Sequence, residues 1–345
     1  MASGKQYKKP LIAICLTTFN PPLKLFSQQI SSIRNQSYPH WVCIISDDCS
    51  APDLYKQIMR VIGNDKRFKV YRTESNLGYY HNFERCLSHV PESAEFIALC
   101  DQDDYWHHDK LNTLFSCFDA NTTLVYSDMS IVDTHGQLIS KSYWTTRRNN
   151  FRDLASLLMA NTITGTASLF RSNLLAYILP FPKRILDAYH DHWIACVALT
   201  VGTVKYVDRP LLDYTQHSSQ VVGWYSPPER PFAQKLAMLR RTVANTFHLI
   251  WNKRLSSTLA YARLFYCARV SRVELLARTL ELRCARVLVS DKERTLRRLA
   301  SIESATGIVW LALRGLNIEP HAETLGEEHA LLVGILWKHL TNLRQ

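Results

Sequence analysis

The sequence predicts an α/β protein with a mostly parallel central sheet, followed by a helical C-terminal region. Three observations support this prediction. In the first half, short β-rich apolar runs alternate with segments whose apolar residues recur at helical spacing, which is typical of a parallel sheet flanked by helices. Polar clusters follow several of the predicted strands. The second half is basic, poor in glycine and helical in its apolar spacing.

Strands and helices alternate along the first half. The strand-like runs cover residues 11–17, 41–45, 68–71 and 96–99. Apolar residues at helical spacing mark two helices between them, one after the Pro21-Pro22 pair and one around Ile58, and a third helix is expected to start near Tyr79. Ligands of such sheets bind beyond the carboxyl ends of the strands, so we expect the functional site there.

The positive charge is concentrated in the second half. The 345 residues carry a net charge of +11. Residues 230–345 contain 19 Lys or Arg and 9 Asp or Glu, a net of +10, which leaves +1 for residues 1–229. The composition changes near the Ser226-Pro227-Pro228 break, where turn-forming residues are typical of a boundary. We therefore expect a catalytic domain over residues 8–225 and a basic α-helical region over residues 226–345.

The composition is that of a globular protein, with 47% hydrophobic and 21% charged residues. The longest uncharged apolar stretch, residues 194–204, is about half of the roughly 20 residues that a membrane-spanning helix needs. The apolar run 11–16 behind three lysines is too short for a signal peptide, so we expect a cytoplasmic protein. Nine cysteines without a Cys-x-x-Cys pair predict buried, reduced thiols and argue against a zinc site.

The basic helical region allows two interpretations of similar weight. Its apolar segments 308–313 and 330–337 each carry a tryptophan, which suits helices that lie on an anionic membrane surface. Helices that only pack against one another produce the same pattern. Nucleic acid binding is not expected, because the sequence has no zinc finger, RNP-type motif or recognisable helix-turn-helix.

Asp101, Asp103 and Asp104 directly follow an apolar run that ends at Cys100. Three carboxylates within four residues repel one another, and a divalent cation would neutralise them. Asp101 and Asp103 could then share a metal ion and its ligand. The alternative is a solvated acidic turn that caps a helix starting near Asp104.

Three further polar residues each have a functional and a structural interpretation. Asp48 follows the second predicted strand and either binds the base or ribose of a nucleotide or caps the helix at Pro52. Asp191 lies in the first turn of a predicted helix and is either a general base, oriented by neighbouring His and Trp residues, or a residue favoured there by the helix dipole. His217 follows a short strand and is either a ligand or a surface histidine.

Several nucleotide-binding and hydrolase folds are excluded by missing motifs. The sequence has no Gly-x-Gly-x-x-Gly turn, P-loop, Gly-x-Ser-x-Gly elbow or His-Glu-x-x-His helix. A nucleotidylyltransferase would carry a Gly-rich, Arg-containing loop after the first strand. This chain instead has Thr17-Thr-Phe-Asn-Pro-Pro22 at that place.

Taken together, these pieces resemble glycosyltransferase family 2, the inverting enzymes with a GT-A fold. The resemblance runs in order from residue 11 to residue 223, about two thirds of the chain. It comprises Leu16-Thr-Thr-Phe-Asn20, Asn35-Gln-Ser-Tyr38, Ser46-Asp-Asp-Cys-Ser50, Asn76-Leu-Gly78, Asp101-Gln-Asp-Asp-Tyr-Trp106, Ser127-Asp128, Thr164-Gly-Thr166, His190-Asp191-His-Trp193 and Tyr214-Thr-Gln-His217. The acidic run and the late Tyr-x-Gln-His are similar to the branch of rhamnosyltransferases that build bacterial surface polysaccharides.

The resemblance implies a nucleotide site and a metal site. The nucleotide is expected to contact Thr17, Phe19, Asp48 and Asp101, with Asp48 on a uracil or thymine ring. The metal, Mn²⁺ or Mg²⁺, is expected at Asp103, Asp101 and His217, with Asp103 as the direct ligand. Such a cation bridges the donor diphosphate and stabilises the leaving nucleotide as a Lewis acid.

The resemblance also implies a catalytic base near the start of a helix. The family often carries a Glu-Asp pair there, and this sequence reads His190-Asp191. Asp191 is therefore expected to take the proton of an acceptor hydroxyl as its oxygen attacks the anomeric carbon, which inverts the anomeric configuration.

The implied function is metal-dependent transfer of a sugar from a nucleotide-diphospho-sugar to a hydroxyl of a lipid-linked oligosaccharide, in O-antigen- or capsule-type polysaccharide synthesis. dTDP-rhamnose is the donor implied by the branch, and UDP-sugars would need the same residues. The basic helices fit a peripheral protein on the cytoplasmic face of the inner membrane. The alternative is a non-catalytic sugar-nucleotide-binding component of an assembly complex, but the complete acidic set favours the enzyme.

Overall fold

The computed structural model describes residues 9–144, 149–185, 188–217, 257–316, 323–324 and 326–342. The strands are β1 (Leu11–Thr18), β2 (Trp41–Asp47), β3 (Phe68–Arg72), β4 (Ala94–Cys100), β5 (Tyr105–Trp106), β6 (Thr122–Val132), β7 (Leu138–Ser140), β8 (Ser168–Arg171) and β9 (Thr203–Thr215). The helices of the first part are α1 (Leu23–Arg34), α2 (Pro52–Ile62), α3 (Gly78–Ser88), α4 (Lys110–Ser116), α5 (Leu154–Met159), α6 (Leu175–Ile178) and α7 (His190–Val201). The C-terminal helices are α9 (Ser257–Cys284), α10 (Ser290–Ala300), α11 (Ala305–Leu316) and α13 (Glu327–Asn342).

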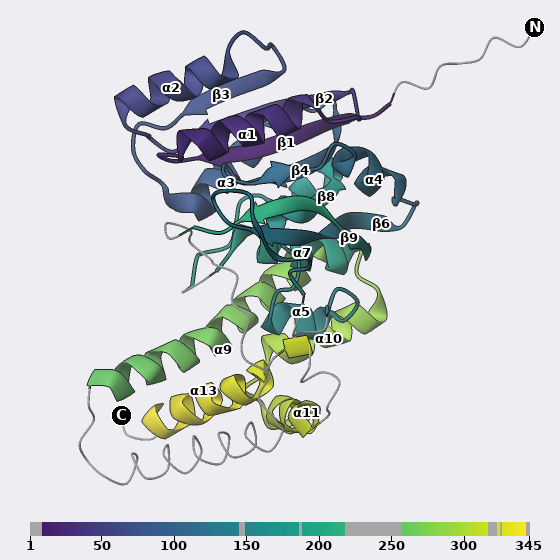
Figure 1. The fold of residues 1–345 in the computed structure, drawn as a ribbon. Coiled ribbons are helices and arrows are strands. Elements are labelled where there is room, and N and C mark those ends of the chain that lie inside the picture. The colour runs from purple at the N-terminus through teal and green to yellow at the C-terminus, as the bar shows by residue number, and fades with distance from the viewer. Residues whose placement is uncertain are drawn as a thin grey trace, which may run out of the picture.

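The strands form one sheet in the order β3-β2-β1-β4-β8-β6-β9-β5, and β7 pairs with β6 beside this path (Figure 1). The first four strands are parallel to one another. β8 is antiparallel to both of its neighbours, β4 and β6. β9 is parallel to β6 and carries the short β5 antiparallel on its other edge. The expected parallel sheet is therefore confirmed for β1 to β4, and the remainder of the sheet is mixed.

Helices cover both faces of the sheet because its first strands are apolar on both sides. In β1, the residues from Ile12 to Leu16 are fully buried, as in the inner strands of parallel α/β sheets. α1, α2 and α4 pack on one face, and α3, α5 and α7 pack on the other. Thr18 lies in register with Asp47, and Leu16 lies in register with Cys100. The polar segments that follow β1, β2 and β4 therefore meet at one edge of the sheet.

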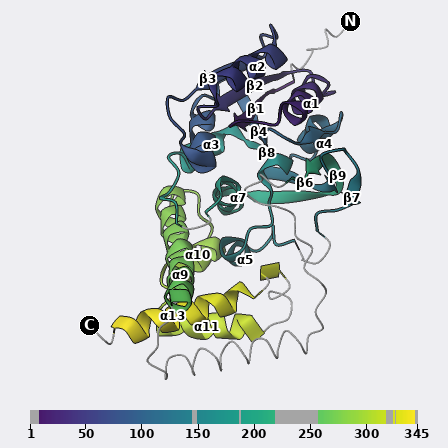
Figure 2. The same ribbon diagram turned by 60° about the vertical axis from the view of Figure 1, so that its left-hand side comes forward.

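The C-terminal helices extend one of these two cores. Apolar residues of α9 lie in the same cluster as those of α5 and α7, namely Val270, Val273, Leu276, Ala277 and Leu280. Figures 1 and 2 show α9 running away from the sheet, with α11 and α13 at its far end. The expected boundary near residue 226 lies outside the described residues, which resume at Ser257. The division into residues 8–225 and 226–345 therefore stays a prediction.

No helix in the described part of the chain is by itself long and apolar enough to cross a membrane. α10 and α11 meet the length and composition criterion as a pair, but a bend of 107° separates their axes. On length and composition alone, this bent pair is a candidate membrane-spanning segment.

The nine cysteines are free thiols, as the sequence predicts. Six of them are buried, and burial raises the pKa of the Cys15, Cys43 and Cys100 thiols well above the usual range. A protonated, buried thiol is unreactive. These cysteines therefore contribute to the apolar core.

Candidate active site

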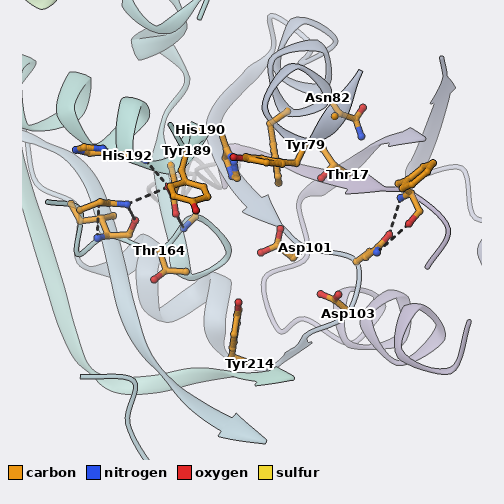
Figure 3. Close-up of a pocket in the computed structure, with 18 of the residues that line it drawn as sticks. Thr17, Tyr79, Asn82, Asp101, Asp103, Thr164, Tyr189, His190, His192 and Tyr214 are labelled. Carbon is orange, nitrogen blue, oxygen red and sulfur yellow. Dashed lines mark hydrogen bonds between the residues drawn. The ribbon is translucent and has the colours of Figure 1, made fainter. Parts of the chain in front are cut away.

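A cavity of about 770 Å³ opens at the edge of the sheet where β1, β2 and β4 end. All seven residues that the sequence analysis assigned to the site line it: Thr17, Phe19, Asp48, Asp101, Asp103, Asp191 and His217. In Figure 3 the carboxyl group of Asp101 lies between Thr17 and Thr164, and that of Asp103 is drawn below it. The fold thus brings together residues that are up to 200 positions apart in the sequence. Their individual roles stay predictions.

The loop after β1 is fastened to the acidic loop by Gln102. The Oγ1 atom of Thr18 and the backbone N–H of Phe19 both donate to Oε1 of Gln102, each at 2.9 Å. The Phe19 side chain remains 45% exposed at the cavity wall. It offers a flat apolar surface of the kind on which a nucleotide base stacks.

Asp48 is buried at the cavity wall and caps a different helix from the one expected. Its carboxylate accepts hydrogen bonds from the backbone N–H groups of Leu77 at 2.7 Å and Gly78 at 2.9 Å, where α3 begins. The alternative of a turn and cap before the helix at Pro52 therefore does not hold for Asp48. The neighbouring Asp47 holds that turn instead, because its Oδ2 accepts from the backbone N–H of Ser50 at 3.1 Å, and α2 begins without a side-chain cap. Because a carboxylate has about four lone-pair positions, Asp48 retains acceptor capacity for a ligand N–H.

Asp103 and His217 are in direct contact. The Nε2 atom of His217 lies 2.8 Å from Oδ2 of Asp103, and both side chains are mostly buried. Asp101 lies in the same acidic cluster. Burial, followed by the negative charges of Asp103 and Asp191, raises the pKa of Asp101 to about 7. The repulsion expected from the sequence is therefore present in the structure.

The donor set fits a hard divalent cation that shares its coordination with a substrate. Within the described ranges, no three His, Cys, Asp or Glu side chains form a ready-made metal site. Mg²⁺ and similar ions are typically held by one or two carboxylates together with substrate phosphates and water. Asp103 and Asp101, with the imidazole of His217, match that pattern. A cation beside them would offset the repulsion that, after burial, raises the pKa of Asp101.

Asp104 has a positioning role that the sequence analysis did not predict. It is 1% exposed and accepts hydrogen bonds from Oγ1 of Thr166 at 2.8 Å and from the backbone N–H of Thr215 at 3.3 Å. The alternative of a solvated acidic turn that caps a helix near Asp104 is therefore wrong. β5 follows instead, and α4 begins at Lys110.

Asp191 lies in the first turn of α7 with its carboxylate held from two sides. The side-chain amide of Asn161 donates to Oδ1 at 3.2 Å, and the backbone N–H of Gly165 donates to Oδ2 at 3.1 Å. Burial raises the pKa of Asp191 to about 6. A carboxyl with this pKa is largely ionised near neutral pH and is still basic enough to accept a proton.

The neighbouring His and Trp side chains do not orient Asp191, contrary to the expectation. The ring of His190 stacks on Phe83 at 3.6 Å between centroids, and burial lowers the pKa of His190 to about 3. The indole N–H of Trp193 donates to the carbonyl oxygen of Ile178. These two side chains fix α7 to its surroundings, whereas Asn161, Gly165 and the backbone N–H of His192, at 2.6 Å from Oδ1, hold the carboxylate.

Further residues line the cavity that sequence reasoning did not single out. Aromatic side chains come from several elements, namely Tyr79, Tyr143, Trp144, Tyr189 and Tyr214. The C-terminal helices contribute Arg269, Arg272 and Glu327. Tyr214 belongs to the Tyr-Thr-Gln-His motif and could have been found there. No local pattern distinguishes the two arginines from the other cations of the basic region.

Residues 13–179 match the family described as glycosyl transferase family 2. A curated relative, the putative teichuronic acid biosynthesis glycosyltransferase TuaG of Bacillus subtilis, is 31% identical over 106 residues, which cover 30% of this chain and 40% of TuaG. The dTDP-rhamnosyl transferase RfbG of Shigella flexneri is 25% identical over 219 residues, which cover 57% of this chain and 70% of RfbG. The alignments span 13%, 66% and 40% of the lengths of the first three curated relatives.

The fold resembles that of a solved glycosyltransferase structure. Residues 1–349 of TarS from S. aureus, in complex with UDP-GlcNAc, superpose with a TM-score of 0.52 at 16% sequence identity. The superposition covers 96% of this chain and 92% of that one. The expected GT-A-like α/β fold with a helical C-terminal region is confirmed. Residues 13–179, just under half of the chain, are thus similar to glycosyl transferase family 2, and the relatives TuaG and RfbG are likewise named as glycosyltransferases.

Proposed function

We propose that this protein transfers a sugar from a nucleotide-diphospho-sugar to a hydroxyl group of a saccharide acceptor, with Mn²⁺ or Mg²⁺ as cofactor. The observation that carries the proposal is the meeting of Asp101, Asp103, His217 and Asp191 in one cavity at the carboxyl edge of the sheet. Metal-assisted displacement at a sugar carbon requires side chains that hold a cation and a carboxylate that accepts a proton. The paired Asp103 and His217 would hold the cation, and the buried Asp191 would accept the proton.

The donor half of the cavity is formed by the loops after β1, β2 and β4. Phe19 supplies a stacking surface for the base, and Asp48 supplies an acceptor for a pyrimidine N–H. Asp103, with Asp101 and His217, would hold the cation. When bound, that cation neutralises the diphosphate and stabilises it as the leaving group.

The acceptor half is organised around Asp191. Its carboxylate takes the proton of the acceptor hydroxyl as the oxygen forms a bond to the anomeric carbon and the bond from that carbon to the diphosphate oxygen breaks. The products are a glycoside of inverted configuration, a nucleoside diphosphate and a protonated Asp191, which returns its proton to water. The hydrogen bonds from Asn161 and Gly165 hold the carboxylate in place for this step.

Rhamnose from dTDP-rhamnose is the donor sugar that we propose first. The support is the similarity to RfbG, named as a dTDP-rhamnosyl transferase. Another relative is named as a UDP-Glc:alpha-D-GlcNAc-diphosphoundecaprenol glucosyltransferase, and the TarS structure contains UDP-GlcNAc. The diphosphoundecaprenol in the first of these two names supports the lipid-linked acceptor that we propose, and O-antigen- or capsule-type polysaccharide synthesis is the process that we propose for it. The UDP-sugars in both names are the next donors to test.

We also propose that the C-terminal helices contact the cytoplasmic face of an anionic membrane. Val309, Leu313 and Leu316 of α11 recur at helical spacing and are 58%, 64% and 80% exposed. Residues 230–345 supply the net charge of +10. Exposed apolar side chains on a basic helical region are typical of proteins that bind a lipid surface.

The test is release of nucleoside diphosphate from a panel of dTDP-, UDP- and GDP-sugars, with Mn²⁺ or with EDTA. We expect release from one donor, abolished by EDTA and by Asp103→Asn but not by Asp53→Asn, which removes a charge from an exposed position on α2. Metal-dependent binding of a donor without release in the presence of lipid-linked acceptors would instead favour a binding component without turnover. No binding of any donor would contradict the proposal.

A further inference from the structure

Lys110, in the first turn of α4, is a lysine without exposed surface. Lysines are almost never fully buried unless their charge has a partner. Its Nζ atom lies 3.4 Å from the centroid of the Trp106 ring and donates a hydrogen bond to the backbone carbonyl oxygen of Thr166. Because this amine is shielded from the cavity, neither substrate can touch it. Any effect of Lys110 on the reaction must therefore act through its neighbours.

Negative charges of the acidic loop lie close to this amine. Burial lowers the pKa of Lys110 to about 7, against the opposing effect of neighbours that include the carboxylates of Asp104 and Asp101. The charge of Lys110 in turn opposes the burial and the repulsion that raise the pKa of Asp101. Lys110 is thus both a counter-charge of the acidic loop and a hydrogen-bond donor to Thr166.

The backbone at the start of α4 gives this side chain a fixed origin. The backbone N–H of Leu111 donates to Oε1 of Gln36 at 3.1 Å, and the side-chain amide of Gln36 donates to the carbonyl oxygen of His107 at 2.8 Å. Gln36 follows α1. The Lys110 side chain therefore reaches Thr166 from a backbone that is tied to the segment after α1.

Thr166 belongs to the short 3₁₀ turn Gly165–Ala167, which contacts both halves of the proposed site. On the donor side, Oγ1 of Thr166 donates to Oδ2 of Asp104 at 2.8 Å. On the acceptor side, the backbone N–H of Gly165 donates to Oδ2 of Asp191 at 3.1 Å. Two consecutive residues thus connect the acidic loop with the proposed base, and the amine of Lys110 holds the second of them.

The proposed reaction depends on the separation of these two halves. The acceptor oxygen must lie about 3–3.5 Å from the anomeric carbon before it attacks, while the diphosphate stays at the acidic loop. The base and the acidic loop must therefore keep a fixed separation. A misplacement of about 1 Å costs on the order of 10²-fold in rate.

We propose that Lys110 is a positioning residue, which fixes Asp191 relative to the acidic loop by holding Thr166. The inference rests on the proposed function and adds a residue to its machinery. Thr166 is 1% exposed, so its carbonyl oxygen cannot exchange the lost amine for bulk water without a shift of the turn. Such a shift also moves the adjacent N–H of Gly165, which holds the Asp191 carboxylate.

Lys110→Met tests this role, because it removes the amine and keeps a long, unbranched side chain. Lys110→Gln keeps a hydrogen-bond donor on a shorter side chain, and it carries the test if Lys110→Met does not fold. The matched control is Lys292→Met. The Nζ atom of Lys292 also donates to backbone carbonyl oxygens, those of Thr200 at 3.3 Å and Gly202 at 2.7 Å, but Lys292 does not line the cavity.

Binding and turnover are measured separately on each full chain. Calorimetric titration with dTDP and with UDP, in the presence of Mn²⁺, gives the affinity and the fraction of molecules that bind. Release of nucleoside diphosphate from the panel of dTDP-, UDP- and GDP-sugars gives kcat and KM. We expect Lys110→Met to bind the nucleotide within about threefold of the wild-type affinity, at the same stoichiometry, and to lose about 10- to 100-fold in kcat. Lys110→Gln should lose less, and Lys292→Met should keep the wild-type kcat.

The pH profile separates positioning from a loss of stability. The groups that face the Asp191 carboxylate are the side-chain amide of Asn161, the backbone N–H groups of Gly165 and His192, and the carboxylate of Asp101. Against the effect of burial, the N–H of Gly165 lowers the pKa of Asp191. In Lys110→Met this hydrogen bond should weaken, so the acidic limb of the rate should move to higher pH by up to about 1 unit. In Lys292→Met the limb should not move.

Two results would overturn the role of Lys110. One is a wild-type kcat in folded Lys110→Met or Lys110→Gln. The other is an equal fall of kcat in Lys292→Met, which would assign the effect to stability. If the wild-type chain binds neither nucleotide, the proposed function itself fails, whereas nucleotide binding with normal turnover in Lys110→Met overturns the positioning role alone.

Discussion

The imidazole Nε2 of His217 lies 2.8 Å from the carboxylate Oδ2 of Asp103, although 114 positions separate the two residues in the chain. β9 makes this contact possible, because it returns beside β6 and pairs with β5 directly after the acidic loop. Asp104 strengthens the junction by accepting a hydrogen bond from the backbone N–H of Thr215. The end of β9 and the acidic loop therefore form one unit at the base of the cavity.

His217→Ala should raise the Mn²⁺ concentration needed for half-maximal turnover by about 10- to 100-fold, because Asp103, the proposed metal ligand, loses its partner. Metal titrations of nucleoside diphosphate release give this value directly. His135→Ala is the matched control, since His135 is exposed in a turn far along the chain from the acidic loop. An unchanged metal requirement in His217→Ala would remove His217 from the metal site.

The rate should depend on pH through Asp191. Burial raises the pKa of this carboxyl to about 6, and a general base acts only when it is ionised. We therefore expect kcat/KM to rise roughly tenfold per pH unit below pH 6 and to level off above it. Asp191→Asn should remove this acidic limb and lower the rate by about 10²- to 10⁴-fold. An acidic limb that persists in Asp191→Asn would assign it to another group.

Asp104→Ala should destabilise the protein and also lower turnover. The substitution leaves the Thr166 hydroxyl and the Thr215 N–H without their acceptor, at a cost of about 1–3 kcal/mol for each buried group. Asp104→Asn keeps one acceptor oxygen and should recover part of the loss. Thermal unfolding and turnover are measured on both variants, with Asp53→Ala as the exposed control. Equal stability of Asp104→Ala and the wild type would contradict the positioning role.

Gly165→Ala should displace the carboxylate of Asp191. A Cβ atom at Gly165 would lie 3.0 Å from Nε2 of His190, 3.2 Å from Cβ of Asp191 and 3.3 Å from Cδ1 of Leu99. A shift of about 1 Å at a catalytic group costs on the order of 10²-fold in rate, so a fall in kcat of about 10- to 100-fold is expected. In Gly315→Ala the new Cβ meets Glu328 at 3.6 Å, an ordinary contact, and turnover should not change. If Gly165→Ala kept the kcat of the wild type, the backbone around Gly165 would be able to shift without displacing Asp191.

Leu313→Asp should weaken binding to anionic vesicles. It places a charge in the exposed apolar stripe of α11, where burial of one leucine in lipid contributes about 1.5–3 kcal/mol. Leu138→Asp is the control, because Leu138 is 55% exposed on β7. Sedimentation with phosphatidylglycerol vesicles separates the two variants. If both pellet like the wild type, α11 is not the membrane contact.

The strands and helices around the donor half could be predicted from the sequence because their local patterns agree with their environment. A strand covered on both faces needs an unbroken apolar run, and the runs of β1, β2 and β4 end where polar residues reach the cavity. The same polar residues were therefore recognisable as site candidates. In the structure β1 extends to Thr18 and β2 extends to Asp47. These two residues lie opposite each other in the sheet.

Contacts between distant segments could not be predicted in this way. Tyr105 and Trp106 form the two-residue strand β5, which is too short to show any periodic pattern in the sequence. This strand forms because Trp106 pairs with Leu212 of β9. Asp48 caps α3 rather than α2 because the chain folds back at Leu77. Arg272 enters the cavity because α9 packs against α5 and α7, and nothing in the sequence around it marks that arrangement.

The most direct test of the account is a calorimetric titration of dTDP and of UDP into the full chain, with Mn²⁺ and with EDTA. If Asp103 and His217 hold a cation that bridges the diphosphate, one nucleotide should bind with Mn²⁺ and lose at least about 10-fold in affinity with EDTA. Asp103→Asn should show the same loss with Mn²⁺ present, and Asp53→Asn should behave as the wild type. Nucleotide binding that is indifferent to both EDTA and Asp103→Asn would contradict the proposed metal-assisted mechanism.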